Sequence, residues 1–397
     1  MPDYNKESLE LHRQLSGKIE IINKTKVLST DDLSKVYSPG VAGPSLEIER
    51  YPETVYDLTI KGNTVAVVSD GSAVLGLGNI GALASLPVME GKCMLFKRFA
   101  GINAFPICLN TQDSDEIVKT IKNIAPVFGG INLEDIAAPR CFYIEKQLQD
   151  IGIPVFHDDQ HGTAIVVLAG LINASKLLNK DIADMKVVIN GAGAAGVAIT
   201  KLLRCIDLED SECVSVKQIL VCDSKGIISQ ERKDLSSEKK ELLQYTNLRN
   251  ISSRLEDALE NADVFIGVSK GNLLTQNHIR SMAKNPVIFA LANPTPKIFP
   301  EEALASGAAI VATGRSDYPN QVNNVLAFPG IFRAALDVRA KKITPSMKIA
   351  AAYALARTLK NPDFNHIITS SLDKETALQV AHAVREAYNK SNVVTHH

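Results

Sequence analysis

Two pairs of neighbouring acidic residues stand where they could do chemistry together. The pairs are Glu134 with Asp135 and Asp158 with Asp159. Each pair follows a short apolar run, residues 127–131 in one case and residues 154–156 in the other. If these runs are adjacent parallel strands, their carboxyl ends meet at one edge of a sheet and gather carboxylates that can hold Mg²⁺ or Mn²⁺ through oxygen. One acidic pair alone is more often a solvated turn, but two pairs ahead of a dinucleotide motif favour a metal site.

A glycine-rich turn further along the chain predicts the dinucleotide site. The apolar, β-rich residues 186–190 lead into a G-x-G-x-x-G pattern and then into a helical stretch. Its glycines are Gly191, Gly193 and Gly196. The first permits a tight turn, the second lets the backbone approach a pyrophosphate, and the third permits close packing of helix on strand. A glycine-rich turn without a ligand is the weaker alternative because strand and helix both flank the pattern.

Asp223 ends the next expected strand, residues 218–222, where this fold holds the adenosine ribose. Its distance from the glycines is longer than usual, and a loop insertion at residues 207–215 explains the difference. A carboxylate favours NAD because it repels a ribose 2′-phosphate, whereas Ser224 and Lys225 could accommodate that phosphate. The sequence therefore predicts NAD or NADP as cofactor and leaves the choice open.

Alternating short apolar runs and helical stretches predict an α/β fold with parallel or mixed sheets. We expect an N-terminal α/β substrate and metal domain in residues 1–161 and a Rossmann-like NAD(P)-binding domain in residues 162–324. Residues 162–178 are expected to form a long apolar helix between them. Residues 325–397 are expected to be helical, to pack back on the first domain and to complete it. Helical spacing also predicts a helix over residues 9–23.

Composition favours small-molecule chemistry in a reducing compartment. The 397 residues suffice for two domains, since single cores stop growing at about 250–300 residues. A formal net charge of −1 offers no basic field for nucleic acid or an anionic membrane. Neither a secretory signal nor a membrane-spanning apolar run is evident, so a cytoplasmic location is expected. The six scattered cysteines, without a C-x-x-C pair, are expected to be reduced thiols.

Several motifs, in order, resemble the signatures of the malic enzyme family. The acidic pairs lie in NLED and HDDQHGTA, which are similar to the family's two metal motifs. Further similar segments are YSPGVA (37–42), DGSAVLGLGNIG (70–81), EGK (90–92), LANPT (291–295) and NNVLAFPG (323–330). The resemblance spans residues 37–335 and suits the short-subunit, bacterial-type form. It implies oxidative decarboxylation of malate to pyruvate and CO₂ with NAD or NADP and Mg²⁺ or Mn²⁺, in a homodimer.

The resemblance also implies a role for each matching residue. The metal ligands would be Glu134, Asp135 and Asp159, with Asp158 beside them and hydrogen-bonded to reacting groups. Lys92 matches the base for the hydroxyl proton, and Tyr37 matches the acid for the enol. Asn293 and Asn324 match residues that contact the substrate near the nicotinamide. Without the family match, Lys92 would be read as a solvated lysine and Tyr37 as a packing aromatic.

Two points of chemistry accompany these roles. Lys92 can act as a base only if its pKa falls from about 10.4, and a nearby divalent cation would have that effect. Ala73 stands where larger relatives have an arginine that binds a substrate carboxylate, and the sequence does not identify a replacement.

Two other function classes stay open at this point. His157 and His161, four residues apart around two aspartates, could bind zinc for hydrolysis. The glutamate of H-E-x-x-H is absent, however, and paired carboxylates prefer harder cations. A non-enzymatic dinucleotide sensor would leave the acids as solvated surface and show no malate-dependent absorbance at 340 nm.

Overall fold

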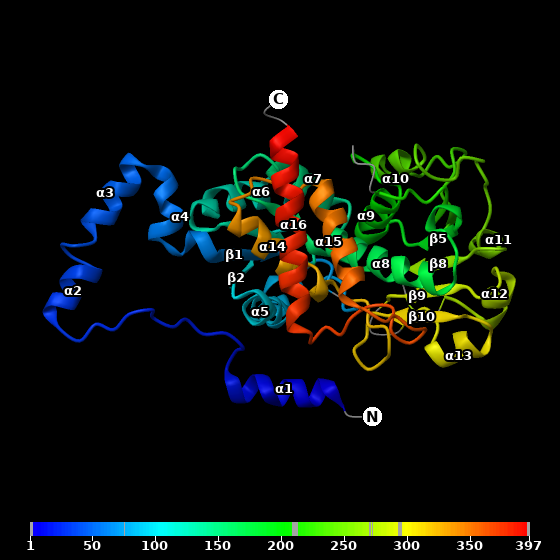
Figure 1. The fold of residues 1–397 in the computed structure, drawn as a ribbon, viewed down its shortest axis with the longest axis horizontal. Coiled ribbons are helices and arrows are strands. Elements are labelled where there is room, and N and C mark those ends of the chain that lie inside the picture. Colours follow the sequence, from blue (N-terminus) through cyan, green and yellow to red (C-terminus); the bar gives the residue numbers. More distant parts are fainter. Residues whose placement is uncertain are drawn as a thin grey trace.

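The computed structural model describes residues 3–74, 76–208, 213–269, 271, 273–292 and 296–394. Within these residues the chain forms two α/β units, each a sheet with helices packed on it, which are called the first and the second layer below. A helical N-terminal segment projects from them (Figure 1). The architecture agrees with the expected α/β fold, an N-terminal domain followed by a Rossmann-like one. The expected domain boundaries stay a prediction.

The first sheet contains four parallel strands in the order β2-β1-β3-β4. The strands are β1 (Thr64–Ser69), β2 (Asn103–Cys108), β3 (Gly130–Leu133) and β4 (Val155–His157). The helices between them are α5 (Gly81–Ala100), α6 (Ser114–Ile124) and α7 (Arg140–Leu148). Strands β1 and β3 are buried along their whole length, as continuous apolar strands of a parallel sheet are. Because the strands run in one direction, the residues that follow them share one edge.

The second sheet has the order β10-β9-β8-β5-β6-β7, and only β7 runs antiparallel to its neighbour in the described residues. Its strands are β5 (Lys186–Asn190), β6 (Gln218–Asp223), β7 (Gly226–Ile227), β8 (Val264–Gly267), β9 (Val287–Ala290) and β10 (Ile310–Thr313). The helices are α9 (Ala194–Leu203), α10 (Ser237–Leu242), α11 (Leu255–Leu259), α12 (Gln276–Ser281) and α13 (Pro300–Ala305). Strand β5 pairs with both β6 and β8, so the strand order reverses beside the glycine-rich turn. Such a switch point is where open α/β sheets bind ligands.

One long helix, α8 (Asp158–Leu177), runs from the edge of the first sheet into the second layer. Residues 164–174 of this helix are buried all round, which explains why its sequence is apolar without a polar face. The described part of the chain contains no helix with the length and apolar character that crossing a membrane requires.

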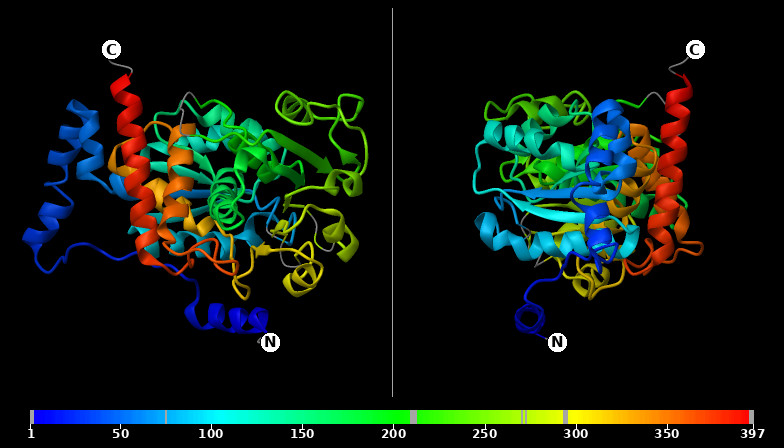
Figure 2. Two further views of the ribbon diagram at one scale, coloured as in Figure 1. Left: turned by 45° about the vertical axis from the view of Figure 1, so that its right-hand side comes forward. Right: turned by 90° about the vertical axis from the view of Figure 1, so that its left-hand side faces the viewer.

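The C-terminal helices pack back on the first layer, as expected. They are α14 (Phe328–Asp337), α15 (Pro345–Thr358) and α16 (Lys374–Val394). The rings of Phe328 and Phe332 lie 4.7 and 5.3 Å from the ring of Phe96 on α5. Helix α14 contacts β3 and α5, and the red helix α16 packs on α14 and α15, far in sequence from the first sheet (Figure 2).

The N-terminal segment differs from the helix expected over residues 9–23. It contains α1 (Tyr4–Leu15), α2 (Thr30–Val36), α3 (Ala42–Arg50), η1 (Pro52–Thr54), α4 (Val55–Leu58) and η2 (Ile60–Asn63). The first helix ends early because Ser16 and Gly17 take left-handed backbone angles, with φ of 55° and 114°. None of the residues of α1 to α4 is buried. The blue helices of Figure 1 accordingly project away from the sheets.

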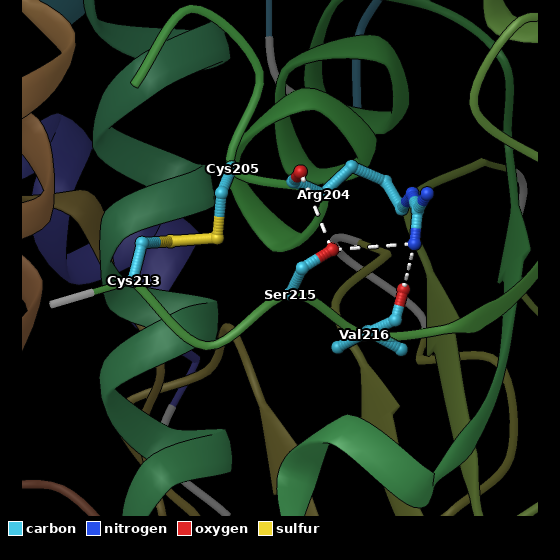
Figure 3. The surroundings of a disulfide bond; sticks show 5 residues. All are labelled: Arg204, Cys205, Cys213, Ser215 and Val216. Atoms are coloured by element: carbon cyan, nitrogen blue, oxygen red, sulfur yellow. Dashed lines mark hydrogen bonds between the residues drawn. A yellow bond between two sulfur atoms is a disulfide. The ribbon is translucent and has the colours of Figure 1, made fainter. Parts of the chain in front are cut away.

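The expectation of six reduced cysteines is wrong for one pair. Cys205 and Cys213 form a disulfide, with their Cα atoms 6.0 Å apart (Figure 3). Cys205 precedes the loop insertion after α9 and Cys213 lies within it, and hydrogen bonds also connect the residues on either side of the insertion. Arg204 donates to the Ser215 hydroxyl and to the Val216 carbonyl at 3.2 and 2.6 Å. The spacing of cysteines along the chain could not reveal this closure.

Candidate active site

The two acidic pairs meet at one edge of the first sheet. Leu133 of β3 lies in register with His157 of β4, so the acids that follow each strand become neighbours. One carboxylate oxygen from each of Glu134, Asp135 and Asp159 lies within 4.8 Å of the other two. The Asp135 backbone N–H donates to Asp159 Oδ2 at 2.8 Å, and its positive φ of 54° turns the chain at this point. These three residues are the metal ligands that the sequence predicts.

The carboxylate cluster has the electrostatics of a cation site. Burial raises the pKa of Glu134 to about 7, of Asp135 to about 9 and of Asp159 to about 6; attraction to Lys92 opposes the rise, and repulsion between the neighbouring carboxylates adds to it. Burying these carboxylates close together costs free energy, because they lose hydration and repel one another when charged. A divalent cation bound among them would attract all three. The donor set, three carboxylates and no thiol or imidazole, fits Mg²⁺ or Mn²⁺.

Lys92, on α5, lies beside this cluster. Its Nζ is 2.9 Å from Glu134 Oε1 and 2.8 Å from Asp158 Oδ2, and it lies 4.6 Å from the centre of the Phe328 ring. Only 10% of the side chain is exposed. Burial lowers the Lys92 pKa, but attraction to the carboxylates outweighs burial and raises the pKa above its usual value. The lysine is therefore protonated in this arrangement, and the lowering by a cation stays a prediction.

Asp158 is fully buried, and only one of its two carboxylate oxygens accepts a side-chain hydrogen bond. Its Oδ2 accepts from Lys92, whereas its Oδ1 has no hydrogen-bond partner among the described residues. A Cβ on Gly162, one turn along α8, would lie 1.9 Å from that Oδ1. Asn324, which begins the short helix η5 (Asn324–Leu326), accepts from Lys92 Nζ at 3.5 Å. Asp158 and Asn324 thus both accept from the amino group of Lys92, and their roles toward the substrate stay a prediction.

The glycine-rich turn opens on a cleft of about 900 Å³ that is lined from both layers. Pro139 and Phe142 contribute from the first layer, and Gly191 and Gly193 from the second. Gly191 has a φ of 128°, and a Cβ on Gly196 would lie 1.7 Å from the Gly191 carbonyl oxygen. A Cβ on Gly193 would meet nothing within 4 Å, so the backbone there is open to a ligand. The geometry matches the part predicted for each glycine.

Comparison with known proteins agrees with both halves of this site. The family models "Malic enzyme, N-terminal domain" and "Malic enzyme, NAD binding domain" match residues 16–149 and 160–388. The chain belongs to the malic enzyme family.

Three relatives illustrate the similarity. The bifunctional malic/malolactic enzyme of Bacillus subtilis is 54% identical over 98% of this chain and 93% of its own length. The NADP-dependent malic enzyme of Haemophilus influenzae is 51% identical over 93% of this chain, which spans 48% of that longer protein. The crystal structure of the NAD-dependent malic enzyme of Thermotoga maritima is 50% identical, with a TM-score of 0.91 over 95% of this chain and 98% of that one.

Two residues that the family resemblance implicates are not placed in the site. Asn293 lies outside the described residues. Tyr37 follows α2 on the projecting N-terminal segment, with 68% of its surface exposed. Its backbone bonds reach only Leu33 and Val41. Helix α2, which ends at Tyr37, lies on the segment that projects away from α5, the helix that contains Lys92 (Figure 1).

The two histidines do not support the zinc alternative. His161 Nε2 lies 2.8 Å from Glu145 Oε1 on α7. His157 is fully buried, and burial lowers its pKa to about 4. The metal-holding group found within the described residues contains neither histidine. Three carboxylates, rather than a pair of imidazoles, make up the group of described residues that could hold a cation.

Basic side chains that the sequence analysis did not single out neutralise two aspartates. Both oxygens of Asp223 are paired: Arg232 donates to them at 2.7 and 2.9 Å, and Lys239 donates to Oδ2 at 2.7 Å. Burial raises the Asp223 pKa, but these bonds outweigh burial and lower it to about 2. The second aspartate is Asp70, whose Oδ2 accepts from Arg140 Nη2 at 2.8 Å. Neither pairing follows a sequence motif, because the partners come from separate loops and helices.

Proposed function

We propose that this enzyme oxidises malate at C2 with Lys92 as the base and decarboxylates the product to pyruvate with Tyr37 as the acid. The observation that carries the proposal is the position of Lys92, whose amino group is held between Glu134 and Asp158 beside the carboxylate cluster. Family membership supplies the reaction, the contacts of Lys92 support its role as the base, and the resemblance of residues 37–42 to a family motif supports Tyr37 as the acid.

Glu134, Asp135 and Asp159 would hold the divalent cation. Bound there, Mg²⁺ or Mn²⁺ supplies positive charge that polarises the C2 oxygen of malate and offsets the carboxylate charge that keeps Lys92 protonated. Asp158 would orient the Lys92 amino group through Oδ2, which leaves its unbonded Oδ1 for a hydrogen bond to a reacting group. Asn324, which accepts from the same amino group at 3.5 Å, would help to orient it.

In the redox step, Lys92 Nζ takes the proton of the C2 hydroxyl while C2 loses a hydride to the nicotinamide ring. The product is a β-keto acid. Its C3–C4 bond then breaks, CO₂ leaves, and the electron pair moves to the C2 oxygen as an enolate. Tyr37 donates a proton to C3, which completes pyruvate.

The dinucleotide would lie in the cleft at the glycine-rich turn, with its pyrophosphate at Gly193 and the N-terminus of α9. Asp223 stands at the ribose end of this cleft, but its charge is neutralised by Arg232 and Lys239. We therefore propose that Asp223 favours NAD because it keeps these two cations from binding the 2′-phosphate of NADP. Since its own charge is neutralised, Asp223 would repel that phosphate less strongly than an unpaired carboxylate would. We also propose that the working form is a homodimer.

A coupled assay tests the proposal. Absorbance at 340 nm is followed with malate and NAD or NADP, in excess chelator and after addition of Mn²⁺, and pyruvate is measured in the same samples. We expect dinucleotide reduction and pyruvate in equal amounts, only with the cation. Lactate is measured as well, because the Bacillus subtilis relative is named a malic/malolactic enzyme. Undiminished activity in excess chelator would contradict the assigned cation site.

A further inference from the structure

A buried lysine lies behind the glycine-rich turn, and the reaction proposed above does not use it. Lys297 lies between β9 and α13 in the second layer, and its side chain is fully buried. Its methylene groups cover Gly267 at the end of β8, where a Cβ would lie 2.5 Å from Lys297 Cγ. An ammonium group is seldom buried completely, because it loses its hydration and must be bound by other groups. The burial of this amine therefore indicates a specific role.

The amine connects the ends of two neighbouring strands. Lys297 Nζ donates to Ser269 Oγ at 2.5 Å, and it donates to Asn190 Oδ1 at 3.3 Å. The Ser269 hydroxyl donates in turn to the same Asn190 oxygen at 2.7 Å. Asn190 is the last residue of β5, and Ser269 follows β8, which pairs with β5. The three side chains therefore form a hydrogen-bonded triangle at the switch point of the second sheet.

Two members of this triangle line the dinucleotide cleft. Asn190 and Ser269 both lie on the wall of the cleft that contains Gly191 and Gly193. The tight turn packs directly on Ser269, since a Cβ on Gly191 would lie 3.1 Å from the Ser269 backbone nitrogen. Lys297 is not one of the described residues that line the cleft, so its amine reaches the cleft through Ser269 and Asn190.

The electrostatic surroundings make the charge of this amine responsive to a bound anion. From β8 the amine meets a hydroxyl and from β5 a carboxamide, both of them neutral. Asp223, the acid that ends the adjacent β6, is paired with Arg232 and Lys239. Burial lowers the Lys297 pKa to about 7. Because a dinucleotide carries negative phosphate charge, its binding nearby would favour the protonated amine and raise that pKa again.

We propose that Lys297 is a positioning residue for the dinucleotide, whose ammonium group holds Ser269 and Asn190 in place and adds positive charge behind the glycine-rich turn. That charge supplements the N-terminus of α9 and offsets the negative charge of the pyrophosphate. The inference rests on the proposed place of the dinucleotide in this cleft. Lys297 does not touch the reacting atoms, so it should affect binding of the dinucleotide far more than turnover. A lysine that only connects two strands is the alternative.

Lys297→Met tests this role, because it keeps the length of the side chain and removes the charge. Binding of the reduced dinucleotide is followed by its fluorescence, and kcat and KM are measured in the malate assay. We expect the Kd and the KM for the dinucleotide to rise about tenfold, the usual effect of one charge-assisted contact. The kcat and the KM for malate should change by less than about twofold. An unchanged Kd for the dinucleotide in Lys297→Met would overturn the proposal.

The pH profile of binding distinguishes a charge from a purely structural contact. In the empty cleft Lys297 loses its proton near pH 7, so the form that binds the dinucleotide better is present below that pH. The wild-type Kd should therefore rise between about pH 6 and about pH 9, and calorimetry in buffers of different ionisation enthalpy should show proton uptake on binding. Lys297→Met should lose most of this rise and all of the matching proton uptake. A profile in Lys297→Met as steep as that of the wild type would contradict the role of the charge.

Two further variants separate this inference from the placement of the dinucleotide. Lys61→Met removes another buried lysine, whose amine donates to three carbonyl groups of the first layer, and it should leave the dinucleotide Kd unchanged. An equal loss of affinity in Lys61→Met and Lys297→Met would overturn the proposal.

Gly193→Val fills the open approach to the backbone, where a Cβ meets nothing within 4 Å, and it should weaken binding of a dinucleotide held in this cleft. If Gly193→Val weakens binding and Lys297→Met does not, only the role of Lys297 is overturned. If neither variant changes the Kd, the placement of the dinucleotide is wrong, and the role of Lys297 fails with it.

Discussion

At the scale of the residue, the site combines the ammonium group of Lys92 with several carboxylates, and most of these groups are buried. Lys92 is held protonated by Glu134 and Asp158, and the acids that surround it have raised pKa values because they are buried together. The same repulsion that makes the cluster unfavourable by itself makes it bind a divalent cation well. Protons and cations therefore compete for the same oxygens.

That competition predicts how stability depends on pH. In an unfolded chain these acids lose their protons near pH 4, but in the fold Asp159, Glu134 and Asp135 hold theirs up to about pH 6, 7 and 9. The folded protein binds more protons than the unfolded chain over this window, so the stability of the metal-free protein should fall as pH rises from 5 to 9. Melting temperatures in chelator should show this fall.

Two controls assign the fall to the cluster. Mn²⁺ should remove most of it by binding the deprotonated acids, and Asp159→Asn should make the slope in chelator shallower than in the wild type. A wild-type slope that neither Mn²⁺ nor Asp159→Asn changes would show that other groups cause it.

Asp223 gives a second prediction at this scale. Its replacement by alanine removes the acceptor of four hydrogen bonds, releases Lys239 and leaves Arg232 with Asp234 as its carboxylate partner at the ribose end of the cleft. We expect the ratio of kcat/KM for NADP to that for NAD to rise about tenfold, the effect of one charge-assisted hydrogen bond of about 1.5 kcal/mol. The KM for malate should change little, and an unchanged NADP to NAD ratio would refute the role of Asp223. Lys233→Ala, which removes an exposed cation that does not line the cleft, is the control.

At the scale of the element, three pieces of backbone set the geometry. Strands β3 and β4 bring their carboxyl ends together, and α8 starts directly at Asp158, so the metal edge and the long helix share residues. Helix α5 passes alongside and contributes Lys92. The site thus depends on how closely α8 approaches α5 and η5.

A substitution at Gly162 tests that dependence, because the absence of a side chain at Gly162 leaves room for the buried carboxylate of Asp158, one helical turn earlier. A methyl group there would collide with Asp158 Oδ1 and press on Asn324, whose Cβ would be 3.1 Å away. We expect Gly162→Ala to lower kcat/KM by at least about tenfold, because overpacking typically costs about 1–3 kcal/mol. Gly152→Ala, in open space but with a positive φ of 84°, is a control for stability alone. A fully active Gly162→Ala enzyme would contradict the close approach.

The elements also explain what the sequence could predict. The carboxylate edge was predictable because each acidic pair follows its own strand, and parallel strands end on the same side. The pairing of Arg232 with Asp223, and of Cys205 with Cys213, depends on how loops close, which no periodicity reports. For Tyr37 the sequence predicted only part of the answer. Its motif indicates a role, but its position depends on the path of the projecting N-terminal segment, which the motif does not determine.

At the scale of the whole molecule, two sheets present their carboxyl edges to one cleft. Pro139 and Phe142 line it from one layer and Gly191 and Gly193 from the other, so residues of both sheets' units would meet a bound dinucleotide. In the proposed reaction the base is on helix α5 of the first layer and the acid is on the projecting N-terminal segment. This separation of two proton-transfer residues is the central claim.

Reduction of supplied oxaloacetate by the reduced dinucleotide tests it most directly. Lys92 acts in the redox step, so microscopic reversibility requires it to deliver the hydroxyl proton in reverse, and Lys92→Ala should be impaired in both directions. Tyr37→Phe keeps the ring and loses only the acid. It should reduce oxaloacetate to malate at nearly the wild-type rate while losing about two to four orders of magnitude in conversion of malate to pyruvate. An equally severe loss of oxaloacetate reduction in Tyr37→Phe and Lys92→Ala, with circular dichroism unchanged, would contradict the division of labour.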